Sequence, residues 1–137
     1  MEASVNHGYL YINSTVYPTL IAISEEEQAK GLMGEPWPPP VMSFVYETPR
    51  VAQFWMKNTP SPLDIVFSHN GVITQICYGE PHSTKLIGDY RVSDLIVELP
   101  HGTVDSSGFK VGHKVGLVAP TIAELKKLFL EKRAGIF

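Results

Sequence analysis

The segment from Leu63 to Tyr78 constrains the fold most strongly, because it has the pattern of a complete antiparallel hairpin. Every second residue from Leu63 to Phe67 is a large apolar residue, which is the two-residue period of a β-strand. Asn70-Gly71 follows, and this pair readily adopts the positive φ angles of a tight hairpin turn. The apolar segment Val72–Tyr78 then forms the returning strand. A chain built around this hairpin is expected to contain antiparallel sheet.

Short apolar segments separated by Gly, Pro, Asn and Asp recur along the chain and predict a mainly β fold. The expected strands are 8–12, 20–23, 41–46, 51–57, 63–68, 72–78, 95–99 and 114–118, with a second hairpin turn at 47–50. Ser24 and Glu27 form a capping box at the start of a short helix near 24–31. The amphipathic spacing after Pro120 predicts a C-terminal helix near 121–133. We therefore expect a single-domain β-sandwich or barrel-like fold with two helices.

Composition and charge bear on the partners of the chain. At 137 residues the chain is long enough to bury a core as one domain. Its net charge of −3 lacks the basic excess of nucleic-acid-binding proteins, so no nucleic-acid partner is expected. No apolar run reaches the length of a membrane span. The first residues lack the basic and apolar segments of a secretory signal, so we expect a cytoplasmic location or incorporation into a particle.

The segment Phe54–Phe67 carries an unusual order of chemistry. An aromatic run is followed by Lys57-Asn58-Thr59, two prolines and a lone carboxylate, Asp64. One interpretation is a structural corner, with Trp55 in the core and Asp64 capping the turn. The other is a polar binding site beside an aromatic wall. The structural interpretation is preferred because polar turns between strands are common.

The binding interpretation has four candidate residues: Trp55, Lys57, Asn58 and Asp64. Catalytic residues are not predicted: the sole cysteine, Cys77, lies in an apolar strand and has the character of a buried small hydrophobe. No metal site or cofactor is predicted either, because the histidines show no zinc-ligand spacing. These scattered histidines are His7, His69, His82, His101 and His113.

The aromatic-Met-Lys-Asn-Thr run resembles the signature of the domain of unknown function 192 family. The matching segments are Gly31–Met33, Met42–Val45, Phe54–Thr59, Pro62–Ile65, Ile96–Pro100 and the glycines and valine at 102, 108, 112 and 115. The resemblance covers about residues 20–118. We therefore expect a single domain, 1–137, with a family-like core at about 20–118 and a C-terminal helical extension at 119–137. Membership implies a compact β-sandwich or barrel-like domain with a short helix, and no settled activity.

Two positions depart from the pattern of the family. Gln28 stands where the family usually has arginine, and His113 stands where an aspartate is usual. If the arginine and the aspartate that are usual at these positions form a site in the family, that site is altered or lost in this chain.

Two hypotheses about function follow. The first is a non-catalytic binding or structural assembly module, such as a component of a virion or another large particle. It has protein partners or associates with itself, and it rests on the amphipathic terminal helix and the lack of a nucleophile or metal pattern. The second is a small-molecule-binding or hydrolytic protein that uses the polar turn at 57–64. The first is preferred, and enzymatic activity is left open.

Overall fold

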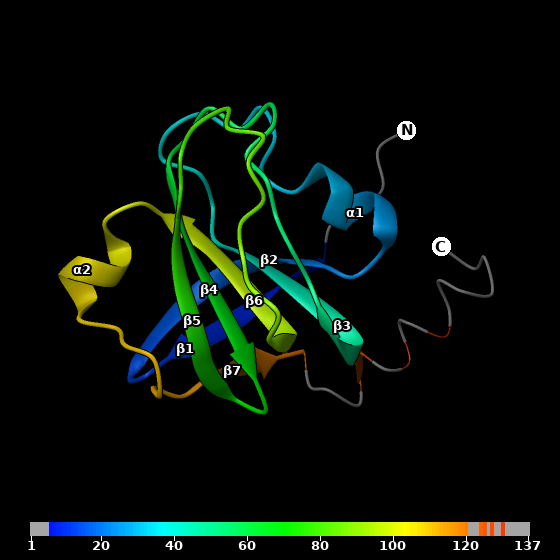
Figure 1. The fold of residues 1–137 in the computed structure, drawn as a ribbon. Helices are drawn as coiled ribbons and strands as arrows, with labels where there is room; N and C mark the ends of the chain where they lie inside the picture. The colour runs from blue at the N-terminus through cyan, green and yellow to red at the C-terminus, as the bar shows by residue number, and fades with distance from the viewer. Residues whose placement is uncertain (1–5, 121–123, 126, 128–129, 131–137) are drawn as a thin grey trace.

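The computed structural model describes residues 6–120 together with 124, 125, 127 and 130. This part of the chain is mainly β, as the sequence predicts (Figure 1). The strands are β1 Asn6–Ile12, β2 Thr15–Ala22, β3 Met42–Val51, β4 Leu63–His69, β5 Val72–Gly79, β6 Val92–Pro100 and β7 Val115–Ala119. The helices are α1 Glu25–Lys30 and α2 Thr103–Ser107. Neither helix is long or apolar enough to cross a membrane.

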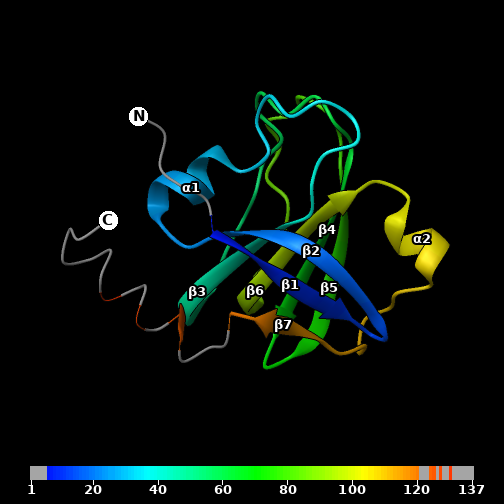
Figure 2. The ribbon, with the colours of Figure 1, turned by 180° about the vertical axis from the view of Figure 1, so that it is seen from behind.

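All seven strands belong to one curled sheet with the order β5-β4-β6-β3-β2-β1-β7. The pairs are antiparallel except β2 with β3, which is parallel. The two edges meet where the Ile73 amide donates to the His113 carbonyl (2.9 Å) and the Val115 amide donates to the Gly71 carbonyl (3.0 Å). Figures 1 and 2 show the resulting half-barrel from its two sides. The expectation of a barrel-like fold is confirmed.

The central strand β6 separates two apolar clusters, because its residues alternate between them. The α2-side core consists of Leu10, Ile12, Val66, Ile73, Leu95, Val97, Leu99, Val104, Phe109 and Val115. The α1-side core consists of Ala22, Leu32, Met42, Phe44, Ala52, Met56, Leu63, Ile65, Phe67 and Ile96. Strand β4 alternates in the same way, with Val66 in the first cluster and its neighbours Ile65 and Phe67 in the second. A side chain's position in either strand therefore decides which side of the sheet it reaches.

Helix α1 forms as its sequence predicts. The Ser24 hydroxyl accepts from the Glu27 amide (3.1 Å), and the Glu27 carboxylate accepts from the Ser24 amide (2.9 Å). This reciprocal box satisfies amides that the first turn leaves free. Gly31 ends the helix at φ +49°, a conformation that favours glycine. The predicted C-terminal helix near 121–133 falls largely outside the described residues.

The expected turn at 47–50 and the expected strand 51–57 are wrong. Strand β3 continues to Val51, and its pairing with β6 shifts from Val45–Leu95 to Arg50–Ser93. Residues 46–49 thus bulge out of the ladder instead of reversing the chain, and Pro49 has no amide hydrogen to contribute to it. Within the expected strand 51–57, the one β-bridge after Val51 joins Phe54 to Ile87.

Three long connections gather at one end of the sheet (Figure 1). They are residues 31–41, 52–62 and 80–91. Backbone hydrogen bonds tie them together: the Gly34 amide donates to the Asn58 carbonyl (2.9 Å), and the Met56 amide donates to the Ser83 carbonyl (2.8 Å). The connections therefore form an ordered layer next to α1, in which the segment 54–62 is central.

Candidate functional site

The structure directs Asp64 away from the turn that precedes it. Asp64 is only 6% exposed, and its carboxylate lies against the segment 101–104. One oxygen is 2.8 Å from the His101 Nδ1, and the other accepts from the amides of Gly102 (3.1 Å) and Val104 (2.9 Å). Asp64 therefore caps the amino-terminal turn of α2. Both of its oxygens are occupied there, so an ion pair with Lys57 is not formed.

Trp55 does not occupy the core position that the structural interpretation expects. Its side chain is 44% exposed, and the Lys57 Nζ lies 5.3 Å from the ring centroid in cation–π geometry. The neighbouring residue, Met56, is fully buried and fills the α1-side core instead. Asn58 adopts φ +56° in the exposed turn. Of the four predicted residues, Trp55, Lys57 and Asn58 lie together. Asp64 lies apart from them, at the start of α2.

A pocket of about 340 Å³ opens between α1, β3, β6 and the segment 50–59. Its volume falls in the range of small-ligand sites. The lining residues are Glu25, Gln28, Ala29, Lys30, Gly31, Leu32, Met33, Phe44, Tyr46, Arg50, Gln53, Phe54, Trp55, Thr59 and Glu98. We refer to it as the α1–β3 pocket. Phe44 and Phe54 pack edge to face with ring centroids 4.8 Å apart, which gives the pocket a rigid aromatic wall.

Glu98 lies at the buried side of this pocket. It is in the central strand β6, where it is paired with Met42 on β3 and with Ile65 on β4. The residue is 4% exposed, and burial raises the pKa of its carboxyl to about 8. No described residue hydrogen-bonds this carboxyl. A buried acid without a protein partner is unusual, because such groups are normally paired.

Tyr46 and Arg50 lie near Glu98 on the wall of the pocket. The Arg50 guanidinium lies 5.1 Å from the centroid of the Tyr46 ring. Burial, opposed by Arg50 and reinforced by Glu98, raises the pKa of Tyr46 to about 12. The phenol therefore keeps its proton at neutral pH. Arg50 makes no ion pair with a described carboxylate, so its charge is available to a ligand.

The two positions that depart from the family pattern do not meet in one site. Gln28 lines the α1–β3 pocket, and its Nε2 donates to the carbonyls of Ala22 and Val45 (3.1 Å each). It thus ties α1 to the sheet. His113 lies in the turn that closes the barrel, where its Nδ1 accepts from the Lys110 amide (3.1 Å). Each of the two side chains has a local structural contact.

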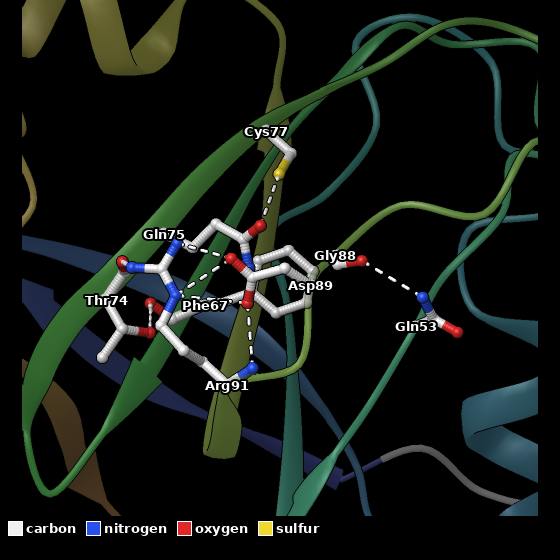
Figure 3. A network of polar contacts seen from close by, with 8 residues as sticks. All are labelled: Gln53, Phe67, Thr74, Gln75, Cys77, Gly88, Asp89 and Arg91. Carbon is white, nitrogen blue, oxygen red and sulfur yellow. Dashed lines mark hydrogen bonds and ion pairs between the residues drawn. The ribbon is translucent and has the colours of Figure 1, made fainter.

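Cys77 belongs to a separate polar network on β5, shown in Figure 3. Burial, with a contribution from Asp89, raises the pKa of its thiol, so the less reactive protonated form predominates. The thiol donates to the Gln75 amide oxygen (3.5 Å). Nearby, Asp89 accepts from Arg91, whose Nη1 also donates to the Thr74 carbonyl (2.6 Å). This network attaches the 88–91 connection to β5. Among the described residues no cluster of three His, Cys, Asp or Glu side chains could hold a metal ion.

The sequence contains one signal that points to Glu98. In Leu95–Leu99 a single carboxylate interrupts an otherwise apolar segment. Apolar neighbours on both sides predict a central strand, and a charged residue within it is either paired or functional. Sequence reasoning alone could not choose between these, because the choice depends on which groups face residue 98 across the sheet.

Comparisons with known proteins agree on the fold. A protein from Sinorhizobium meliloti 1021, which carries the provisional description of a transcription regulator, superposes with a TM-score of 0.78 at 26% identity, over 85% of this chain and 98% of that one. A protein of unknown function from Novosphingobium aromaticivorans DSM 12444 gives a TM-score of 0.73 at 27% identity, over 83% and 93% of the two chains. A search of curated proteins found no match. The sequence model of the family described as Uncharacterized ACR matches residues 11–117, so the chain belongs to the domain of unknown function 192 family.

Proposed function

We propose that this protein binds a small organic molecule in the α1–β3 pocket, with Glu98 as the group that anchors it. One observation carries the proposal: Glu98, a residue only 4% exposed whose carboxyl has no hydrogen-bond partner among the described residues, lines a pocket of about 340 Å³. Ligand pockets typically combine apolar walls with a few polar groups of this kind.

The energetics of Glu98 favour a role in binding over a role in folding. Its neighbours Val97 and Leu99 are fully buried apolar residues, and an apolar residue would also stabilise position 98. Instead the carboxyl is buried at a cost that its raised pKa reports. A ligand that hydrogen-bonds this group would compensate for that cost, and perturbed carboxyl groups in pockets are frequent in functional sites.

The proposal develops the small-molecule hypothesis and changes its residues. Trp55 remains in the site as part of the pocket wall, with Lys57 against its exposed ring. Asp64 does not line the pocket and instead caps α2. The proposal is limited to binding, because it rests on a pocket and a buried carboxyl and not on an arranged pair of nucleophile and base. The Thr59 hydroxyl in the lining donates to the Lys57 carbonyl (3.2 Å).

The assembly-module hypothesis has less support. Neither the described residues nor the comparisons support a virion component or a self-associating structural protein. Light scattering of the full chain across a range of concentrations tests it directly. Stable oligomers at micromolar concentration would favour that hypothesis over the binding protein.

A thermal-shift screen of a metabolite library tests the proposal. We expect one or more compounds to raise the melting temperature of the wild type and to have little effect on the Glu98→Gln variant. Glu80→Gln, which changes an exposed carboxylate outside the pocket, is the matched control and should respond as the wild type does. If every stabilising compound acts equally on all three proteins, the pocket is not the binding site.

A further inference from the structure

We propose that the ligand of the α1–β3 pocket is a small zwitterion, whose ammonium group binds Glu98 and whose carboxylate faces Arg50. This inference rests on the proposed function, because it names the class of molecule that the same pocket takes. Its basis is that a carboxyl and a guanidinium, neither paired with an opposite charge among the described residues, line one pocket.

The buried side of the pocket favours an ammonium group. A primary ammonium has three N–H donors and no acceptor, whereas an ionised carboxylate has only acceptors. Charge-assisted bonds of this type are roughly twice as strong as neutral ones. The aromatic residues Phe44, Tyr46 and Phe54 line the same pocket, and aromatic faces attract cations. A ligand carboxylate at Glu98 would instead meet an acid or a like charge.

Arg50 provides the binding group for the carboxylate at the other end of the ligand. Its guanidinium lies against the Tyr46 ring, and both Arg50 and Glu98 act on the pKa of the same Tyr46 hydroxyl. Glu98 and Arg50 therefore both lie near one phenol, as the two ends of a compact ligand require. Arg is the side chain best adapted to bind a carboxylate, through paired N–H donors.

Proton linkage distinguishes this ligand class from others. With a pKa of about 8, Glu98 carries its proton in about nine-tenths of empty molecules at pH 7. Binding of an ammonium favours the ionised carboxylate, so the proton passes to the buffer. A neutral ligand requires no such release, and a carboxylate bound at Glu98 would retain or take up a proton.

Other titratable groups must be separated from Glu98 in this test. Those lining the pocket are Glu25 and Lys30 in α1, and Tyr46 and Arg50 on β3, while β4 presents Ile65 opposite Glu98. All of them are shared by the wild type and Glu98→Gln. The difference between these two proteins therefore reports on Glu98.

The experiment is calorimetric titration of the full chain with three probes that share a phenyl body: phenylalanine, phenethylamine and 3-phenylpropionate. We expect phenylalanine to bind most tightly, phenethylamine about tenfold more weakly, and 3-phenylpropionate not measurably. Titration in two buffers of different ionisation enthalpy should show release of nearly one proton per phenylalanine at pH 7. The affinity for phenylalanine should rise by nearly tenfold between pH 6 and pH 7.

Two variants assign the contacts. Glu98→Gln should weaken both amines by about tenfold or more and abolish the proton release. Arg50→Gln should weaken phenylalanine by about three- to tenfold and leave phenethylamine unchanged, because only the former has a carboxylate. Circular dichroism of each variant checks that the fold is retained.

Three results would overturn the inference: 3-phenylpropionate binding as tightly as phenylalanine, amine binding without proton release, or no binding of either amine. The last result, together with Glu98-dependent compounds from the metabolite screen, would refute the ligand class and leave the pocket as a binding site. A screen without any Glu98-dependent compound would refute the proposed function itself.

Discussion

Replacing Glu98 with Gln should change how stability depends on pH. Gln has nearly the shape of Glu but cannot ionise, so the variant removes the buried titration and keeps the packing. The raised pKa, from 4.5 to about 8, corresponds to about 5 kcal/mol between the two protonation states. Water entering the pocket would reduce this value, so about 5 kcal/mol is the upper limit of the effect.

The sign follows from the proton balance. Below pH 4.5 both the folded and the unfolded chain carry the proton on Glu98. Between pH 4.5 and about 8 the unfolded chain releases it while the folded protein retains it, so the free energy of unfolding falls as pH rises. Above about pH 8 the folded protein also ionises and the loss levels off.

The assay is urea unfolding at pH 5, 7 and 9, followed by tryptophan fluorescence. We expect Glu98→Gln to gain stability relative to the wild type by several kcal/mol between pH 5 and pH 9, with unchanged m-values. Glu80→Gln, the exposed control, should run parallel to the wild type. Wild-type and Glu98→Gln curves that stay parallel within about 0.5 kcal/mol would refute the reasoning, since they would mean that Glu98 titrates alike in both states.

Three further substitutions have defined outcomes. Asp64→Ala removes the acceptor of two amides at the start of α2 and should lower the free energy of unfolding by about 2–4 kcal/mol in urea melts; a loss below about 1 kcal/mol would contradict its role as a cap. Trp55→Ala should lower it by less than about 2 kcal/mol, because the ring is 44% exposed, and should weaken binding of pocket ligands; a loss of 3–5 kcal/mol would be that of a core residue. Gly88→Ala would place a methyl group 2.9 Å from the Phe67 ring at φ +108°, and we expect a loss of about 1–3 kcal/mol. Gly112→Ala, which has a similar φ of +96° and no atom within 4 Å, controls for the backbone strain, and equal losses at both positions would show that the close contact is unimportant.

Local features that depend on neighbours along the chain are predicted correctly from the sequence. The capping box of α1 joins Ser24 to a residue three positions away, and the Asn70-Gly71 turn joins two consecutive strands. The prediction is wrong at residues 47–50, where the composition suits a turn but β3 continues. The reason is that this end of β3 pairs with β6, more than 40 residues later, and local turn preference does not specify a distant strand.

The candidate site shows the same division. The sequence determined that the chain is mainly β, that it has the family signature around Trp55 and Lys57, and that Asp64 and Glu98 each lie within strands. Tertiary structure alone decided their partners: the ring nitrogen and the two amides that hydrogen-bond the Asp64 carboxylate come from 37 to 40 residues away, and the Glu98 carboxyl has no hydrogen-bond partner among the described residues. Strand alternation fixes which face a side chain takes, but sheet order and curvature fix what lies on that face. For that reason Asp64 serves as a helix cap, and Glu98 lies at the buried side of a pocket.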